Sequence, residues 1–294
     1  MGYILSCEST ADLTAEHLAA RDIRHVCFHF SINGKDYLDD LGESIPYEHF
    51  YEEVAAGAEM KTWQVNISEY VAFFESFLEQ GLDIVHVCLS SGITGTVLSA
   101  RNAAAIVKER FPERKVYIID SLGASSGYGL LMDEAATKRD EGLSAEELAE
   151  WLEENKKRLN HWFFSTDLSA YVRGGRISKT AAVFGGILEI CPLLDMDGQG
   201  RLMPRDKVRT KKRVIREIVK RMHQYADGGS EYSGKCYISQ SACYEDARQV
   251  ADLIEAEFPN LDGKVEINWV GTCIGSHTGP GTVALFFWGK ERGE

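Results

Sequence analysis

The chain has 294 residues, 44% of them hydrophobic and 26% charged, which is the balance of an ordinary globular protein with room for two domains. Its 45 aspartates and glutamates exceed its 32 lysines and arginines, and the net charge of −13 disfavours binding to nucleic acid or to an anionic membrane surface. No apolar run approaches the roughly 20 residues of a membrane span, and the N-terminus lacks a signal-peptide pattern, so we expect no stable membrane insertion.

The cysteines indicate a reducing compartment. They are odd in number, scattered and without a C-x-x-C pair, which disfavours a disulfide framework or a zinc knuckle. The histidines show no metal-ligand spacing. We therefore expect a cytoplasmic protein that holds no metal ion.

Apolar runs of strand length alternate with helical patterns through the first half of the chain, which predicts a parallel sheet with crossover helices. Strands are expected at Tyr3–Cys7, His25–Ile32, Asp83–Leu89 and Lys115–Asp120. Helices are expected at 14–20, from the Ser44/Pro46 start signal, from a Ser68 cap to Gly81, from 96 to about 110, after 120 to Gly142, and from a Ser144/Glu147 capping box to near Leu159.

The second half mixes hairpins with helices, which predicts a smaller mixed sheet. Strands are expected at Trp162–Thr166, Ile187–Met196, near Leu202, and at 235–239, 264–270 and 282–288, with helices at 210–226 and 245–258. D-G-Q-G at 197–200 is a hairpin signal. We therefore expect an α/β protein of two lobes. Residues 1–160 are expected to form a three-layer α/β/α lobe with a mainly parallel sheet, and residues 161–294 a smaller α/β lobe with a mixed sheet.

The segment S-S-G-I-T-G-T at 90–96 is the first candidate ligand loop. It follows a predicted buried strand and precedes a helix, and ligands of open α/β sheets bind at such strand ends. Ser91 and Thr94 offer hydroxyl donors, Gly95 lets backbone N–H groups approach a ligand, and the helix N-terminus favours an anion. The loop has four hydroxyls, those of Ser90, Ser91, Thr94 and Thr96, whereas helix capping would need only one, so we favour a ligand site. No lysine follows the glycines, which excludes a P-loop, and the G-x-S-x-G order of a hydrolase is absent.

Three further polar segments are candidates, each with a structural alternative. K-T-W-Q-V-N at 61–66 is predicted to be a loop between two helices and offers Thr62 and Gln64, although alone it would be taken for a plain loop. Paired glycines in Y-V-R-G-G-R-I-S at 171–178 place Arg176 on a tight turn, where it suits a carboxylate or phosphate but equally a structural salt bridge. His277 lies in G-S-H-T-G-P-G at 275–281, predicted to be a rigid loop before the last strand, where a structural histidine is the alternative.

A basic segment interrupts the acidic average. Ten cations between residues 201 and 221 accompany two acidic residues; they are Arg201, Arg205, Lys207, Arg209, Lys211, Lys212, Arg213, Arg216, Lys220 and Arg221. A solvated helix face with its preceding loop would explain them. The functional alternative is an anion site or a docking patch for an acidic partner.

Taken together, these segments resemble those of the DegV family, bacterial fatty-acid-binding proteins, over about residues 3–290 and in the same order. The matching segments are E-S-T-A-D-L at 8–13, K-T-W-Q at 61–64, S-S-G-I-T-G-T at 90–96, I-D-S at 119–121, G-G-R-I-S at 174–178, C-P-L-L at 191–194, V-R-T-K-K at 208–212 and H-T-G-P-G at 277–281.

The resemblance implies two α/β lobes with the ligand between them. It also implies a carrier of a long-chain fatty acid, with no catalytic residue of its own and no cofactor beside the bound lipid. In the family, hydroxyls at the positions of Thr62 and Thr94 bind the carboxylate, and the positions of Arg176, Arg209 and His277 surround the head group and its outlet. A separate ATP-dependent kinase protein, similar to dihydroxyacetone kinases, phosphorylates the carboxylate while the acyl chain stays buried.

The resemblance also directs attention to the basic segment and to the head-group loop. Arg205 and Arg209 become candidates for docking the kinase. Trp63, Val65 and Asn66 replace a Ser, a Pro and a Ser of the family pattern, and these changes bear on the preferred chain length and unsaturation. In the same comparison Thr94 replaces a Ser and Glu8 an Asp.

Two other functions stay open from the residues. One is an acyl-ester hydrolase with Thr94 or Ser91 as nucleophile and His277 as base, although no motif supplies a residue to orient the histidine. The other is a lipid sensor that relays its state to a different partner. Esterase turnover without a partner would indicate the enzyme, and lipid carriage without turnover would indicate the carrier.

Overall fold

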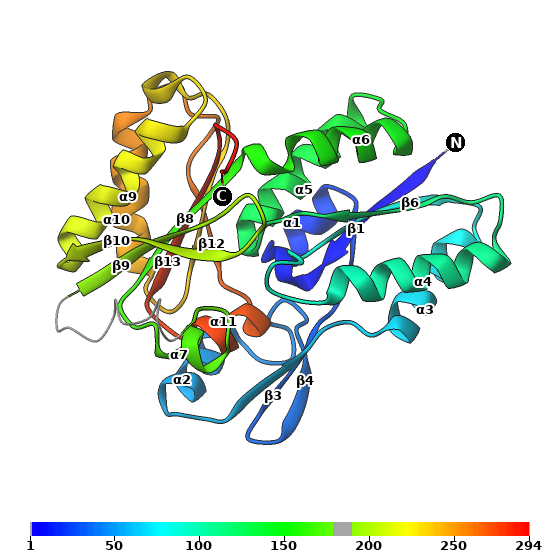
Figure 1. Ribbon diagram of the computed structural model, residues 1–294, viewed down its shortest axis with the longest axis horizontal. Coiled ribbons are helices and arrows are strands. Elements are labelled where there is room, and N and C mark those ends of the chain that lie inside the picture. The colour runs from blue at the N-terminus through cyan, green and yellow to red at the C-terminus, as the bar shows by residue number, and fades with distance from the viewer. Residues whose placement is uncertain (1, 179–189, 294) are drawn as a thin grey trace.

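Three β-sheets organise the protein, and the computed structural model describes residues 2–178 and 190–293 of it (Figure 1). The first sheet is parallel, as predicted, with the strand order β2-β1-β6-β7. Its strands are β1 (Tyr3–Glu8), β2 (Ile23–Val26), β6 (Asp83–Cys88) and β7 (Val116–Asp120). Their carboxyl ends therefore lie at one edge of the sheet.

The second sheet has the order β10-β9-β8-β13-β11-β12 and is mixed, as predicted, because β11 and β12 pair in parallel and the other neighbours are antiparallel. Its strands are β8 (Leu159–Ser165), β9 (Ile190–Met196), β10 (Leu202–Arg209), β11 (Cys236–Gln240), β12 (Glu266–Trp269) and β13 (Thr282–Trp288). The D-G-Q-G segment joins β9 to β10 as an antiparallel hairpin, which confirms that prediction. The predicted first residues of β9, from 187 to 189, lie outside the described residues.

Helices cover both sheets, and one helix is shared between them (Figure 1). On one face of the first sheet lie α3 (Ile67–Leu78) and α4 (Thr96–Arg110), and on the other α5 (Ser125–Asp140) and α6 (Ala145–Asn155). The second sheet is covered by α9 (Lys211–Tyr225) and α10 (Tyr244–Glu257). Shorter helices are α1 (Ala15–Ala20), α2 (Tyr47–Ala55), which begins directly after Pro46, α7 (Ser169–Arg173) and α11 (Thr272–Thr278). Because α5 also contacts β8, β11 and β13, it forms a layer common to both sheets.

The sequence does not predict the third sheet, which is antiparallel with the order β4-β3-β5. Its strands are β3 (His29–Ile32), β4 (Lys35–Leu38) and β5 (Met60–Trp63). The single strand expected at His25–Ile32 is wrong, because the chain leaves the first sheet after Val26. The Phe28 N–H donates to Ser9 Oγ at 3.1 Å, and the Phe28 carbonyl accepts from the Asp39 N–H at 2.9 Å. The loop expected at 61–66 is likewise wrong in its first half, which belongs to β5.

Helix ends follow the sequence where the cap is local. The Ser144/Glu147 capping box is present at the start of α6. Ser68 is not the cap of α3, because Asn66 fills that position with a capping box of its own. The end of α6 also differs from the prediction: the helix stops at Asn155, and a short 3-10 turn leads directly into β8.

We propose a lobe boundary near residue 160, where β8 begins. The hydrophobic core is continuous across this boundary, since one buried cluster contains Leu5 and Val85 from the first sheet, Leu131 from α5, and Phe163 and Phe286 from the second sheet. Among the helices of the described ranges, none combines the length and apolar character needed to cross a membrane.

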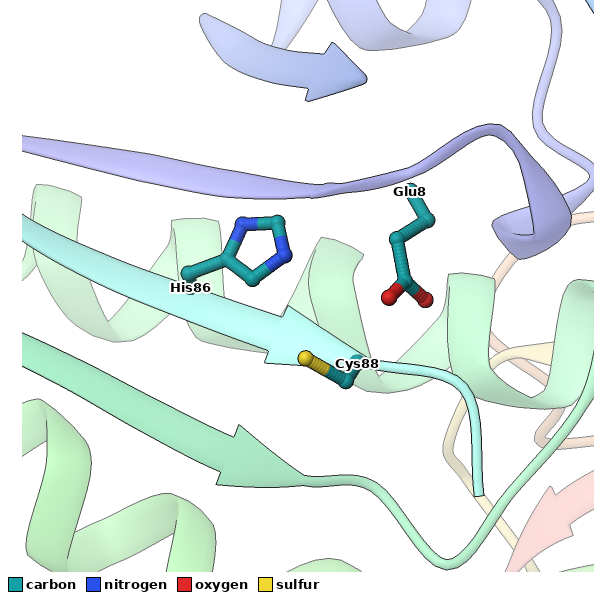
Figure 2. A group of neighbouring side chains, drawn as sticks. All are labelled: Glu8, His86 and Cys88. Atoms are coloured by element: carbon teal, nitrogen blue, oxygen red, sulfur yellow. The ribbon is translucent and has the colours of Figure 1, made fainter. Parts of the chain in front are cut away.

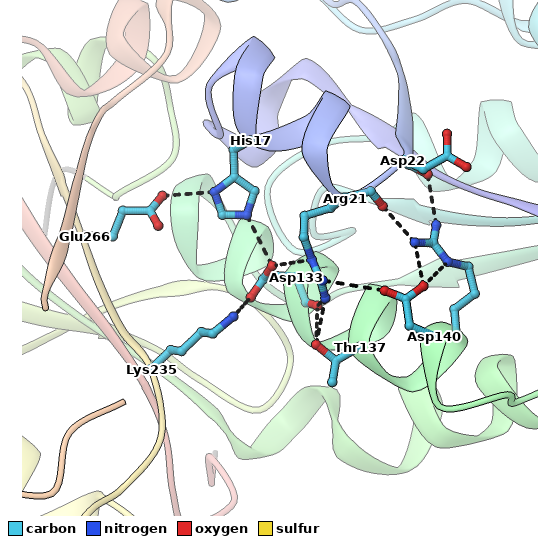
Figure 3. Close-up of polar contacts among 9 residues, drawn as sticks. His17, Arg21, Asp22, Asp133, Thr137, Asp140, Lys235 and Glu266 are labelled. Atoms are coloured by element: carbon cyan, nitrogen blue, oxygen red, sulfur yellow. Dashed lines mark hydrogen bonds and ion pairs between the residues drawn. The ribbon is translucent and has the colours of Figure 1, made fainter. Parts of the chain in front are cut away.

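Beside this core, five charged residues join the two lobes (Figure 3). Asp133 of α5 binds His17 Nε2 at 3.2 Å and Arg21 Nε at 2.9 Å, and it also pairs with Lys235 of the second lobe. Nδ1 of His17 lies 3.2 Å from Glu266 Oε1 on β12. We call His17, Arg21, Asp133, Lys235 and Glu266 the interlobe charge cluster. Hydrogen bonds to Asp133 and Glu266 raise the pKa of His17 to about 9, so this imidazole is protonated at neutral pH.

Candidate functional site

A cavity of about 720 Å³ lies between the two lobes, within the range of roughly 300–1,000 Å³ that is typical of small-molecule sites. Leu89 and Ala124, which follow β6 and β7, line it from the first lobe. Phe163 of β8 and Phe286 of β13 line it from the second lobe. The cavity therefore occupies the carboxyl edge of the parallel sheet, where ligands of open α/β folds bind.

Most of the cavity wall is apolar. Large hydrophobic side chains from both lobes line it, among them Phe28, Leu89, Ile93, Phe163, Met196 and Phe286. An aliphatic chain would gain dispersion contacts along this wall and would need no hydrogen-bond partner there. The wall therefore suits a hydrocarbon ligand.

His161 is a polar side chain within this apolar wall. Its Nδ1 binds the Leu159 carbonyl at 3.1 Å, and its Nε2 accepts from the Ala124 N–H at 3.2 Å. Burial keeps the pKa of His161 well below its usual value, so the ring is neutral. Because both of its nitrogens are hydrogen-bonded to backbone groups, the His161 ring is held in place and contributes its surface to the cavity wall.

Thr62, Arg176 and His277, each proposed from a separate segment, meet at one polar end of the cavity. Nη1 of Arg176 lies 3.4 Å from Nδ1 of His277, and Nε2 of His277 lies 2.7 Å from Thr62 Oγ1. Because Nδ1 faces a donor, the neutral ring carries its proton on Nε2 and donates it to Thr62. The hydroxyl hydrogen of Thr62 is then available to an acceptor in the cavity.

The imidazole of His277 is held neutral and close to the backbone. Burial and the neighbouring Arg176 lower the pKa of His277 to about 4. A Cβ atom at Gly174 would lie 2.7 Å from Nδ1 of His277, so the glycine leaves the space that the ring needs. The predicted rigid loop around His277 is wrong, since this residue lies on α11.

Thr94 reaches the cavity from the loop that follows β6, and its hydroxyl is already bonded. Thr94 Oγ1 donates to Gln64 Oε1 at 3.1 Å, and Gln64 Nε2 donates to Ser99 Oγ at 2.9 Å. A Cβ atom at Gly95 would lie 3.2 Å from Gln64 Oε1, so Gly95 gives clearance to the Gln64 amide as well as to the cavity that it lines.

Three of the candidate residues do not line this cavity. Ser91 is exposed, and its backbone N–H donates to Asp120 Oδ1 at 3.1 Å. Arg205 lies on β10, where its Nε donates to Asp195 Oδ1 at 2.8 Å. Arg209 is exposed at the last position of the same strand.

The hydrolase arrangement is not formed in the described part of the chain. Nε2 of His277 faces Thr62 and carries a proton, so it cannot take one from a nucleophile. The Thr94 hydroxyl donates its hydrogen bond to Gln64 and not to a base. Neither Thr94 nor Ser91 is hydrogen-bonded to His277.

A buried carboxyl group, Glu8, supports the ligand loop from behind. Its Oε2 accepts from the Leu89 N–H at 2.6 Å, and its Oε1 accepts from Thr96 Oγ1 at 2.8 Å and from the Tyr70 hydroxyl. Burial raises the pKa of Glu8 to about 7, although these hydrogen bonds lower it. Leu89 and Thr96 flank the loop at its two ends, so Glu8 fixes both ends.

Glu8 also belongs to the group of side chains in the described ranges that could offer three ligands to a metal ion. Figure 2 shows Glu8 of β1 facing His86 and Cys88 of β6, with ligand atoms all within 4.8 Å of one another. Both oxygens of Glu8 already accept hydrogen bonds, and His86 Nδ1 lies 2.9 Å from Ser6 Oγ. We therefore assign the group to support of the loop.

The sequence does not indicate the roles of Gly174, Ser99 and His161. Ser99 lies one helical turn beyond Gly95, so its nearness to the loop follows from helical periodicity once α4 is placed. Gly174 and His161 matter through contacts with His277 and Ala124, which are distant along the chain, and no local pattern reports such contacts.

Comparison with known proteins gives a consistent result. A family model described as "Uncharacterised protein, DegV family" matches residues 5–290. A DegV domain-containing protein of Clostridium perfringens is 33% identical over 290 residues, which cover 99% of this chain and 98% of the relative.

Solved structures share the fold. A DegV family protein from Thermus thermophilus, described as fatty acid binding, has a TM-score of 0.87 at 26% identity and covers 99% of this chain and 100% of its own. The fatty acid kinase B3 protein of Streptococcus pneumoniae, loaded with linoleic acid, has a TM-score of 0.82 at 22% identity, with 99% and 100% covered.

Proposed function

Because the chain belongs to the DegV family, we propose that it binds a long-chain fatty acid, with the acyl chain along the apolar wall and the carboxylate at the polar end of the cavity. The observation that carries this proposal is the combination of an apolar cavity with two threonines, Thr62 and Thr94, at its wall. Arg176 adds a positive charge beside them, which favours an anionic head group.

The apolar wall sets the affinity in this proposal. Burying about 15 carbons of a C16 chain at ~0.8 kcal/mol each gives roughly 12 kcal/mol of gross stabilisation. Hydrogen bonds to a charged group contribute on the order of 1.5–3 kcal/mol each and are offset by desolvation of the carboxylate. The two hydroxyls therefore set mainly the orientation of the ligand.

The second part of the proposal is that the protein acts in the cytoplasm, presents the carboxylate to a separate ATP-dependent kinase and does not itself catalyse a reaction. The Streptococcus pneumoniae neighbour, which is named as part of a fatty acid kinase, supports this role. So does the proton on Nε2 of His277, which leaves the cavity hydroxyls without a base there. Arg205 and Arg209 are the proposed docking residues for the kinase.

Native mass spectrometry of the purified protein, followed by solvent extraction, tests the binding role. We expect one fatty acid per chain, and its identity gives the preferred chain length and unsaturation. A protein that stays free of lipid after incubation with fatty acids would overturn the proposal. Turnover of an acyl ester without any partner would instead identify a hydrolase.

Substitution of Thr94 by Ala separates binding from presentation. We expect the fatty acid affinity of Thr94→Ala to fall by less than about tenfold, since the acyl chain dominates binding. Phosphorylation of the bound lipid by a bacterial fatty acid kinase should fall much further, because the carboxylate loses its orientation. A large loss of affinity with turnover intact would contradict this assignment, and normal affinity with normal turnover would show that Thr94 does not position the head group.

A further inference from the structure

The hydroxyl of Thr94 has one hydrogen, and in this structure Gln64 takes it. Thr94 Oγ1 donates to Gln64 Oε1 at 3.1 Å, while the amide nitrogen of Gln64 donates to Ser99 Oγ at 2.9 Å. Gln64 lines the cavity, so its amide is close to the ligand position. Any role of Gln64 in binding rests on the proposed function, in which a carboxylate occupies this end of the cavity.

A carboxylate creates a conflict at Thr94, because an ionised carboxyl group accepts hydrogen bonds and donates none. If Thr94 turned its hydrogen toward the ligand, its oxygen would face Gln64 Oε1, another acceptor, across the same 3.1 Å. A buried acceptor facing an acceptor loses a hydrogen bond and adds repulsion. Binding is then favoured only if Gln64 changes what it presents to Thr94.

We propose that Gln64 positions the ligand carboxylate by turning its side-chain amide over, and that the hydroxyl of Ser99 makes this turn possible. A half turn of the side-chain amide would present Nε2 to Thr94 Oγ1 and Oε1 to Ser99. Ser99 can accept from the amide before the turn and donate to it afterwards, since a hydroxyl does both. Gln64 therefore stays hydrogen-bonded to both Thr94 and Ser99 in the two arrangements, and after the turn the Thr94 hydrogen is directed to the ligand.

Thr62, on the other side of the polar end, has a fixed partner instead. Its oxygen accepts from Nε2–H of His277, whose other nitrogen faces Arg176, so His277 leaves the Thr62 hydrogen for another acceptor. The polar end therefore has one fixed donor and one conditional donor. The conditional donor lets Thr94 serve an acceptor-only head group after the amide has turned, whereas a head group that donates would meet the Thr94 oxygen without that turn.

The test compares two ligands of equal chain length, palmitate and palmitamide, by calorimetric titration of the delipidated full-length protein. Gln64→Glu replaces the amide by a group that accepts only. Gln64→Met removes the polar amide and leaves the Thr94 hydrogen unclaimed. Gln80→Glu makes the same charge change at an exposed residue, where Gln80 Nε2 donates to the Ser76 carbonyl at 2.5 Å, and serves as the matched control.

In Gln64→Glu we expect the dissociation constant for palmitate to rise about tenfold or more, while that for palmitamide stays within about twofold. Gln64→Met should lose less affinity for palmitate than Gln64→Glu, and Gln80→Glu should match wild type. The effect must also pass through Thr94, so in a Thr94→Val background the Gln64→Glu substitution should change palmitate binding by about twofold or less.

Three outcomes would overturn the inference or its premise, and they differ from one another. A Gln64→Glu protein that binds palmitate as wild type does would remove the role of Gln64. An effect of Gln64→Glu that persists undiminished in the Thr94→Val background would assign it to charge repulsion alone. A wild-type protein that binds neither ligand would overturn the proposed function itself.

Discussion

Gly174 lies close enough to His277 that a side chain at this position would change where the imidazole sits. An alanine Cβ there would lie 2.7 Å from Nδ1 of His277 and 3.2 Å from the Ala170 carbonyl oxygen. The backbone of Gly174 is in the right-handed helical region, so alanine brings no strain of its own. The substitution therefore displaces His277 while Thr62, Arg176 and His277 themselves are retained.

We expect Gly174→Ala to weaken fatty acid binding about tenfold, because the displaced ring no longer donates to Thr62 and no longer fixes the direction of its hydroxyl. Calorimetric titration of the delipidated protein measures the change. Gly293→Ala is the matched control, since a Cβ at Gly293 meets nothing within 4 Å. Equal affinity in the two variants would show that the place of His277 is irrelevant to the head group.

At the scale of elements, the β9–β10 hairpin of the second lobe rests on the ligand loop of the first. Ser90 Oγ donates to the Gly200 carbonyl at 2.8 Å, and a Cβ at Gly92 would collide with the backbone of Gly200. Gly200 itself has a φ of +71°, and a Cβ there would collide with Ser90 Oγ. The hairpin and the loop can approach this closely only because both carry glycine at the contact.

Gly200→Ala should therefore destabilise the protein by more than the strain of its positive φ alone. Gly263→Ala is the control for that strain, since Gly263 has a φ of +79° and nothing within 4 Å of a Cβ. We expect Gly200→Ala to lose about 1–3 kcal/mol more than Gly263→Ala in urea unfolding, because the collision must be relieved by backbone movement. Equal losses of unfolding free energy in the two variants would mean that the hairpin moves away from the loop at no cost.

The interlobe charge cluster makes stability depend on pH in a definite direction. The pKa of His17 is raised from 6.5 to about 9, so the folded protein holds this proton more tightly than the unfolded chain does. The stability that His17 contributes is complete below about pH 6.5 and is lost as the pH rises through about 9. Asp133 and Glu266 have lowered pKa values and stay ionised across that window.

In urea unfolding between pH 6.5 and pH 10, we expect the wild type to lose about 2 kcal/mol more than His17→Gln does. His49→Gln is the control, because His49 is exposed on α2 and its nearest carboxylate oxygen is 3.6 Å away. If the unfolding free energy of His17→Gln falls with pH as much as that of the wild type, the proton on His17 does not stabilise the contact between the lobes.

Sequence reasoning succeeds for elements whose determinants are local. The Ser144/Glu147 capping box and the D-G-Q-G hairpin each depend on residues a few positions apart, and both are present. The break after Val26 is missed because its cause is a hydrogen bond between Phe28 and Ser9, 19 positions apart. The helical start of the 275–281 segment is missed because its three glycines resemble a loop.

The candidate site is also predicted only in part: the sequence indicates its residues but not the contacts between them. Residue types and strand-end positions single out Thr62, Thr94, Arg176 and His277, and the structure gathers all four around one cavity. The hydrogen bond from Thr94 to Gln64 joins loops 30 positions apart, and no pattern in the sequence reports it. Close packing explains the glycine in helix α11. A Cβ at Gly275 would lie 2.5 Å from the Tyr51 hydroxyl, so the small residue lets α11 lie close against α2.

At the scale of the whole molecule, charge is unevenly distributed. Several cations of the basic segment are paired with acidic neighbours: Arg201 with Asp197, Arg205 with Asp195, Lys211 with Asp246 and Arg221 with Asp206. Arg209 is exposed and has no ion pair with any other residue in the described ranges. In a chain of net charge −13, an unpaired cation of this kind is suited to attract an acidic surface.

Charge reversal at Arg209 tests the docking role more cleanly than reversal at Arg205, which would also place a second acid beside Asp195. We expect Arg209→Glu to slow phosphorylation of the bound fatty acid by a bacterial fatty acid kinase about tenfold at low salt, with fatty acid affinity unchanged. Lys157→Glu is the control, because Lys157 is another exposed cation for which the described ranges hold no ion pair. Unchanged kinetics in Arg209→Glu would remove this residue from the docking surface.

The place of β13 in the second sheet has a consequence for synthesis on the ribosome. The first sheet is complete once Asp120 has emerged, but the second has β13, ending at Trp288, between β8 and β11. At about 5–20 residues per second, the interval between the two is roughly 10–30 s. During that time Leu89 and Ile93 lack the part of the cavity wall that Phe286 supplies. The nascent chain therefore exposes the apolar side chains that the first lobe contributes to the cavity. Chaperones and free lipid can reach them before the second lobe has folded.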